Sequence, residues 1–138
     1  VPNPGYPTYT SLSKILGAEV INYDLKEEDG WMPDFETLEK MDLSRVKLMW
    51  TNYPNMPTGA NATPEIYERL VDFARRKNIV IVNDNPYSFI LNDKPISILS
   101  VPGAKDCCIE FNSMSKSTIC PAGVSACWRQ TRNSYNGY

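Results

Sequence analysis

A continuous run of four β-branched residues, Ile79-Val80-Ile81-Val82, constrains most strongly how this chain can fold. Such a run predicts a strand that is covered on both faces, as in a parallel sheet. It follows the clearest helix in the sequence, which has Thr63 as N-cap and Pro64 at its first position and closes at Asn78. Because this helix leads directly into the strand, the segment is typical of an α/β domain.

The other predicted elements agree with this fold class. One strand is expected before the helix, at Val46–Thr51, and another late in the chain, at Cys107–Phe111. Together these patterns predict a mostly parallel sheet that is flanked by helices. Weaker patterns predict a short helix over Thr8–Leu16, a strand over Glu19–Leu25 and a short helix that begins at Asp34.

Composition excludes several classes of function. The chain has no histidine, so it has no Ser-His or Cys-His nucleophile pair and no histidine-ligated metal site, and we predict no metal centre. Its four cysteines show no C-x-x-C spacing, which argues against a zinc site or a disulfide framework. A net charge of −2 gives no reason to expect nucleic acid as a partner. No apolar run is long enough to span a membrane, so a cytoplasmic location is expected.

Polar clusters follow the three expected strands. Asn52–Gly59 follows the first strand, Asp84–Tyr87 follows the second, and Ser113–Lys116 follows the third. Each cluster alone could be an ordinary solvated turn or strand end. However, ligands of open α/β sheets bind beyond the carboxyl ends of the strands. The shared position of the clusters therefore predicts a binding site at that edge.

The order and spacing of these clusters resemble a known family. A Pro-Thr-Gly turn ends at Gly59, an Asp-x-x-Tyr motif begins 25 residues later, and Ser-x-Ser-Lys follows one more strand. This combination is similar to the class I and II aminotransferases of fold type I. The opening segment Asn3–Tyr9 also resembles the family's sequence upstream of the turn. The resemblance covers Val1 to Ser117 and implies a partial large domain that binds pyridoxal 5'-phosphate.

The resemblance implies roles for five residues. Lys116 matches the lysine that holds the cofactor as a Schiff base and carries the proton during amino transfer. Asp84 matches the carboxylate that keeps the pyridine nitrogen protonated, and Tyr87 matches the phenol that hydrogen-bonds the ring oxygen. Ser113 matches a phosphate-binding hydroxyl. Tyr6 matches the aromatic residue that stacks on the ring, with an ordinary core tyrosine as the alternative.

The turn departs from the family at one position. The family usually has Asn directly before Pro-Thr-Gly, where it donates to the cofactor and to the substrate carboxylate, whereas this chain has Met56. We expect Asn55 to point elsewhere, and we assign Met56 no polar role. Pro4 and Pro57 occupy positions where the family can have cis peptide bonds.

The resemblance stops after Ser117. The family continues with Gly-x-Arg-x-Gly, whose arginine binds the cofactor phosphate, but Val124 stands where that arginine belongs. The segment Thr118–Trp128 has neither helical nor strand periodicity. Back-translation from Ser117 with one inserted base yields Gly-Trp-Arg-Ile-Gly at the required place. We therefore interpret residues 118–138 as a frameshifted tail, with a divergent natural C-terminus as the alternative.

The sequence thus predicts a fragment of an aminotransferase that moves an amino group from an amino acid to a 2-oxo acid. The resemblance implies a homodimeric parent enzyme. It also implies that this chain lacks the upstream phosphate loop and the small domain, so we expect the chain itself to be inactive. A decarboxylase, lyase or synthase of the same fold type is one alternative, and a non-catalytic α/β binding module is another.

Overall fold

A four-stranded sheet with the strand order β3-β4-β5-β6 forms the centre of the computed structural model, which describes residues 1–90, 94–113, 116 and 126–128. The strands β3 (Leu48–Asn52), β4 (Val80–Asp84) and β5 (Cys108–Ser113) are parallel, and β6 (Ala126–Trp128) is antiparallel to β5. The predicted α/β class and the mostly parallel sheet are confirmed.

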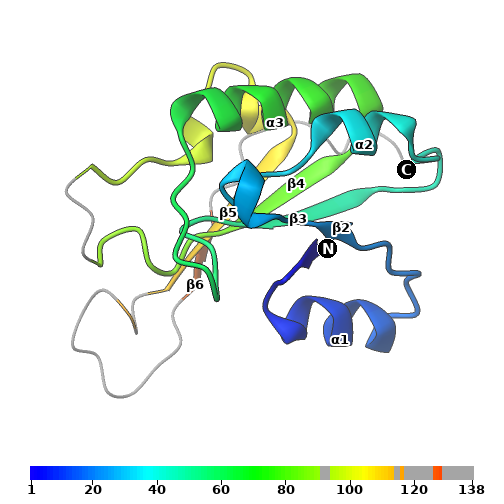
Figure 1. Ribbon diagram of the computed structural model, residues 1–138, viewed down its shortest axis with the longest axis horizontal. Helices are drawn as coiled ribbons and strands as arrows, with labels where there is room; N and C mark the ends of the chain where they lie inside the picture. The colour runs from blue at the N-terminus through cyan, green and yellow to red at the C-terminus, as the bar shows by residue number, and fades with distance from the viewer. Residues whose placement is uncertain (91–93, 114–115, 117–125, 129–138) are drawn as a thin grey trace.

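Helices flank this sheet on both sides (Figure 1). The helices α2 (Phe35–Lys40) and α3 (Pro64–Lys77) lie on one side, and α1 (Pro7–Ile15) lies on the other. A two-stranded parallel sheet, β1 (Pro2–Asn3) and β2 (Tyr23–Asp24), brackets α1 in sequence. The described residues also form three short 3-10 helices, namely η1 (Glu27–Asp29), η2 (Ile98–Ser100) and η3 (Ala104–Asp106). No helix in the described part of the chain is long and apolar enough to cross a membrane.

Local signals define α3 at both ends. The Thr63 hydroxyl accepts a 3.3 Å hydrogen bond from the Ile66 amide, which satisfies one of the free amides of the first turn. Asn78 ends the helix in the left-handed conformation, with φ 53°. Between these ends, Leu70 and Phe73 are buried in the main core against the sheet. This cap-to-cap helix positions the start of β4, because only Ile79 separates Asn78 from that strand.

Two strands differ from their predictions. The strand expected over Glu19–Leu25 pairs with β1 only at Tyr23–Asp24, because β1 has only two residues, and Leu25 forms an isolated bridge with Pro33. Conversely, β6 lies in the segment for which the sequence predicts no strand. A backbone ladder along β5 requires no alternation of side chains, so periodicity could not show β6.

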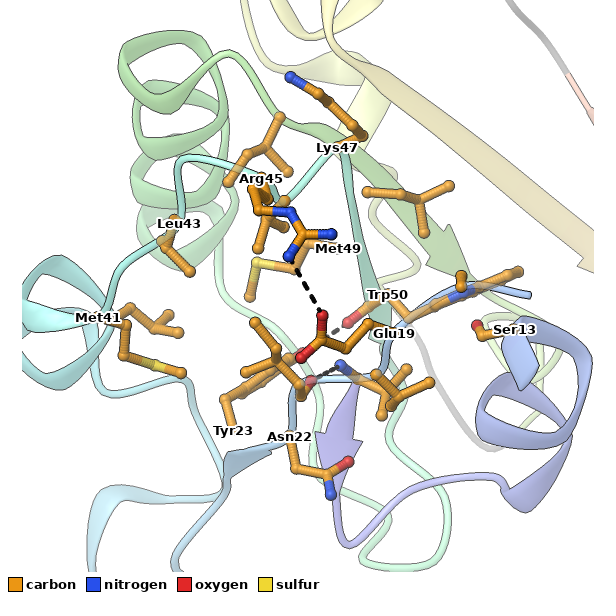
Figure 2. A pocket seen from close by; sticks show the side chains of 18 of the residues that line it. Ser13, Glu19, Asn22, Tyr23, Met41, Leu43, Arg45, Lys47, Met49 and Trp50 are labelled. Carbon is orange, nitrogen blue, oxygen red and sulfur yellow. Dashed lines mark hydrogen bonds and ion pairs between the residues drawn. The ribbon is translucent and has the colours of Figure 1, made fainter. Parts of the chain in front are cut away.

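An apolar groove of about 500 Å³ borders the segment before β2 and the free side of β3 (Figure 2). Met41, Leu43 and Met49 are among its lining residues, and the Tyr23 hydroxyl crosses toward β3 to donate a 2.6 Å hydrogen bond to the Trp50 carbonyl. This groove does not include the two predicted site residues Asp84 and Tyr87, although Trp50 lines it.

Candidate functional site

The carboxyl ends of the three parallel strands form the candidate site. Asn52, Asp84 and Phe111 are register partners on β3, β4 and β5. The Asn52 side chain donates a 2.8 Å hydrogen bond to the Asp84 carbonyl, and its oxygen accepts a 2.8 Å bond from the Met56 amide. The Asn85 amide donates to the Phe111 carbonyl at 2.8 Å. These bonds tie the turn after β3 and the chain after β4 to the same sheet edge.

Asp84 lies at the centre of this edge. Its Oδ2 atom accepts a 2.6 Å hydrogen bond from the Tyr9 hydroxyl of α1. Burial raises the pKa of the Asp84 carboxyl above its ordinary value, and the bond from Tyr9 opposes this rise. The Oδ1 atom makes no hydrogen bond with any described residue. Asp84 therefore has one oriented oxygen and one oxygen that is available to a cationic group.

Aromatic rings line the α1 side of the site. The Tyr9 ring stacks on Trp50 with a centroid distance of 4.6 Å and an interplanar angle of 12°. Tyr6 contacts Tyr9 edge-on at 5.6 Å, and Trp50 stacks on Phe111 at 6.2 Å. Tyr9 is buried, but the Tyr6 side chain is 42% exposed. Tyr6 is therefore not a core residue in this structure, and part of its ring is open to a ligand.

Tyr87, three residues after Asp84, contacts Met56 of the turn that follows β3. The Tyr87 hydroxyl donates to the Met56 sulfur at 3.6 Å, a weak contact because a thioether is a poor acceptor. This contact corrects the prediction that Met56 has no polar role. Asn55 is buried and accepts a 2.8 Å bond from the Thr58 hydroxyl, so it does point elsewhere, as expected. Tyr87 is thus left with an acceptor that a stronger one could displace.

The two remaining predicted residues, Ser113 and Lys116, lie at or beyond the end of β5. Ser113 is the last residue of β5. Lys116 lies three residues further on, its side chain is exposed, and no hydrogen bond or ion pair joins it to another described residue. The structure therefore brings Asp84, Tyr6 and Tyr87 to one edge and sets Ser113 there as well, but it does not join Lys116 to them.

Cis peptide bonds flank the site segments. The Asn3-Pro4 and Met56-Pro57 bonds are both cis, as the resemblance implies. The Tyr53-Pro54 bond is also cis, which the sequence analysis does not predict.

Three residues of the site have no role in the sequence analysis, namely Tyr9, Trp50 and Asn52. Tyr6 lies two residues before the predicted helix and Tyr9 lies in its first turn, so the two rings are close in sequence. Trp50 and Asn52 are two residues apart on β3, so their side chains point to the same face of the sheet. These spacings were a usable signal for the side of the site, although not for the contact with Asp84.

The arrangement fits a cationic aromatic cofactor such as pyridoxal phosphate. A half-buried carboxylate without a cation is costly, and a protonated pyridine nitrogen at its free oxygen would offset that cost. The partly open Tyr6 ring offers a stacking surface, and Tyr87 offers a phenol donor. The described residues contain no cluster of three metal-ligating side chains.

Comparison with known proteins also indicates an aminotransferase. The family model for aminotransferase class I and II matches residues 1–133. An LL-diaminopimelate aminotransferase from Dehalococcoides mccartyi is 44% identical over 119 residues, which cover 85% of this chain and 31% of that protein. One from Aquifex aeolicus is 44% identical over 117 residues, which cover 83% of this chain and 30% of that protein.

Solved structures resemble the fold as well. Apo BacF from Bacillus subtilis aligns with a TM-score of 0.78 at 41% identity, over 83% of this chain and 30% of that one. An aminotransferase from Escherichia coli aligns with a TM-score of 0.76 at 33% identity, over 84% of this chain and 29% of that one. The chain spans about a third of the length of its relatives. On this fold, these motifs and this match, the chain belongs to the class I and II aminotransferase family.

Proposed function

We propose that this chain carries part of the cofactor site of an aminotransferase that uses pyridoxal phosphate, as its family does. In this site Asp84, Tyr87, Ser113 and Lys116 hold the cofactor and Tyr6 stacks on its ring. The observation that carries the proposal is the setting of Asp84. It is half-buried at the end of a parallel strand, one oxygen is held by Tyr9, and the other makes no hydrogen bond with any residue that the structure describes.

Each residue has a distinct task. When bound, pyridoxal phosphate supplies an electron sink for the electrons that an amino acid releases with its α-proton. The Asp84 carboxylate keeps the ring nitrogen protonated, and the Tyr87 hydroxyl donates to the ring oxygen. The Ser113 hydroxyl binds phosphate. The Lys116 amine would hold the cofactor and would carry the α-proton of the substrate.

The substrates of the whole protein are proposed as an amino acid and a 2-oxo acid, and its assembly as a homodimer. Two relatives described above are LL-diaminopimelate aminotransferases, which makes that diamino acid the first amino donor to test. For the chain itself we propose little or no activity, since the 119 residues that align with such a relative cover only 31% of it.

We also propose that residues 1–117 form a partial large domain and that residues 118–138 are a frameshifted tail. The alignments with two relatives extend over 119 and 117 residues, a length close to that of the proposed partial domain. The family model reaches residue 133, beyond the proposed boundary. Sequencing the encoding DNA tests it: a reading frame without a single-base loss relative to the full-length gene would refute the tail.

The cofactor site is tested by adding pyridoxal phosphate to the purified chain and recording visible absorption. We expect a weak band, and borohydride reduction followed by peptide mass spectrometry should locate the label on Lys116. Lys116→Ala should abolish the band, whereas Lys40→Ala, which removes an exposed lysine of α2, should leave it unchanged. Label spread evenly over the surface lysines would contradict the site. Turnover of amino acids by the chain would contradict its inactivity.

A further inference from the structure

A row of buried polar residues crosses the sheet one step before the candidate site. Thr51, Asn83 and Glu110 are register partners on β3, β4 and β5. Thr51 and Asn83 are 0% exposed and Glu110 is 4% exposed. Side-chain direction alternates along a strand, so this row faces away from Asp84, toward α3. The Tyr67 hydroxyl of α3 confirms this orientation, because it accepts a 3.3 Å bond from the Asn83 amide.

Glu110 is the acceptor on which this row converges. Its Oε2 atom accepts from the Asn83 side chain at 3.0 Å and from the Ile98 amide at 3.1 Å. Its Oε1 atom accepts a 2.7 Å bond from the Ser97 hydroxyl. No lysine or arginine in the described part of the chain forms an ion pair with it. A buried carboxylate is costly, so these three donors are what makes the position tolerable.

The donors come from both ends of the segment that carries Tyr87. Asn83 is the residue directly before Asp84 on β4. Its side-chain oxygen accepts a 2.9 Å hydrogen bond from the Thr51 hydroxyl. Ser97 and Ile98 lie where the chain returns to the sheet and begins η2. Glu110 thus joins the exit from β4 and the return at η2 to one point on β5.

We propose that Glu110 is a positioning residue for the candidate site. Its carboxylate fixes where β4 ends and where the following segment returns, and it thereby fixes Asp84 and Tyr87 relative to β5. An apolar side chain of the same size would fill the space but would leave the donors of Asn83 and Ile98 unsatisfied. The roles of Asp84 and Tyr87 rest on the proposed function. The clamp, by which we mean the hydrogen bonds that Glu110 accepts from Asn83, Ser97 and Ile98, can be measured without cofactor.

The experiment is amide hydrogen exchange by NMR on the full 138-residue chain. The reporters are two amides that do not touch Glu110. One is the Asn85 amide, which donates to the Phe111 carbonyl, and the other is the Ile90 amide, which donates to the Tyr87 carbonyl. They report whether the exit from β4 and the Tyr87 turn stay closed. Because exchange through local opening is separable from global unfolding, it distinguishes positioning from mere stability.

Three variants form the comparison. Glu110→Leu removes the acceptor, and Glu110→Gln keeps one acceptor oxygen for Asn83 and Ile98 while its amide can donate to the Ser97 hydroxyl. Cys108→Ala is the matched control, because Cys108 is buried in the same strand but does not bond to Glu110. At equal global stability, we expect Glu110→Leu to speed exchange at both reporters at least about tenfold over Cys108→Ala. Glu110→Gln should restore rates close to those of the unmodified chain.

Equal exchange in the Leu, Gln and control variants would overturn the proposal, because the reporters would then follow global stability alone. If Glu110→Leu does not fold, Ser97→Ala replaces it, since it removes one donor and leaves two. A folded Ser97→Ala chain should show faster exchange at Ile90, and an unchanged rate there would also overturn the clamp. Failure of pyridoxal phosphate to bind would count against the proposed function and leave these rates untouched.

Discussion

The Tyr9 hydroxyl donates a 2.6 Å hydrogen bond to Oδ2 of Asp84, although 75 positions separate the two residues. This bond joins α1 to the end of β4, and the stacking of Tyr9 on Trp50 fixes the donor's ring. Burial, followed by the bond to Asp84, raises the pKa of the Tyr9 phenol well above its ordinary value. Tyr9 therefore stays protonated over the working pH range and acts only as a donor to this carboxylate.

Replacing Tyr9 by Phe should raise the pKa of Asp84. The hydrogen bond from Tyr9 favours the charged carboxylate and so lowers the pKa of Asp84, whereas burial raises it. Without the bond, the effect of burial is no longer opposed by Tyr9. A carboxyl 13C NMR titration of the chain measures this directly. We expect the Asp84 titration to move to higher pH.

Tyr6→Phe is the matched control for that titration. Tyr6 touches the edge of Tyr9 but makes no hydrogen bond with Asp84. Its substitution should leave the Asp84 titration in place. If both variants shift the titration equally, the shift comes from repacking of the aromatic rings, and the bond from Tyr9 has no special role.

Replacing Asp84 by Asn should stabilise the chain at neutral pH. The folded-state pKa of Asp84 is raised above its ordinary value of 3.8, so its favourable contribution is complete below that value and is lost as the pH rises through the folded pKa. Asn keeps an acceptor for Tyr9 and has no charge to bury. The gain in unfolding free energy should be less than about 1 kcal/mol, because the carboxylate remains partly solvated.

Urea unfolding at a series of pH values checks this prediction. The gain in unfolding free energy from Asp84→Asn should shrink as the pH falls to about 4, because the Asp84 carboxyl takes up its proton over this range. Asp29→Asn, which changes an exposed carboxylate, serves as the control. If the unfolding free energies of Asp84→Asn and the unmodified chain instead differ by the same amount at every pH, the ionisation of Asp84 does not cause the stabilisation.

The sequence predicts best those elements whose determinants are local. The helix α3 begins and ends where predicted, because Thr63, Pro64 and Asn78 act on the backbone beside them. The strand β4 follows because its apolar run needs only to be covered on both faces. The edge location of Asp84 then follows from the rule for parallel sheets.

What sequence could not supply depends on distant pairing. The length of β2 is set by how much of β1 lies beside it, and β6 is set by the edge of β5. The bond between Tyr9 and Asp84 is non-local in the same sense, since neither residue's neighbours encode the other. Met56 was misjudged for a different reason: its sulfur gains a contact only because Tyr87 is brought opposite it.

Replacing Met56 by Asn should strengthen the binding of pyridoxal phosphate to the chain. The Tyr87 hydroxyl currently donates to a thioether sulfur at 3.6 Å, and an Asn at this position would offer a donor to the cofactor and a better acceptor. One added hydrogen bond is worth about 1 kcal/mol, which is about a fivefold increase in affinity. Titration of the visible absorption band measures it.

Met56→Leu separates the polar effect from volume. Leu removes the sulfur but keeps an apolar side chain of similar size. We expect it to bind the cofactor no better than the unmodified chain. Equal strengthening by Asn and Leu would mean that the sulfur hinders the ligand sterically, and the missing amide would not be the cause.

Asn78 offers a test of the backbone that leads into β4. It adopts φ 53° with no side-chain hydrogen bond to another described residue, so its conformation is what matters there. Asn78→Ala should lower the free energy of unfolding by about 1 kcal/mol, because a Cβ without a compensating polar group is disfavoured in this region. Asn78→Gly should change it by less than about 0.5 kcal/mol, since glycine adopts this conformation readily. Asn61→Ala, at an exposed position with ordinary φ, should have little effect. Chemical denaturation of the four chains decides the point: if Gly costs as much as Ala, the loss would stem from the Asn side chain, and the left-handed cap would not be what fixes the start of β4.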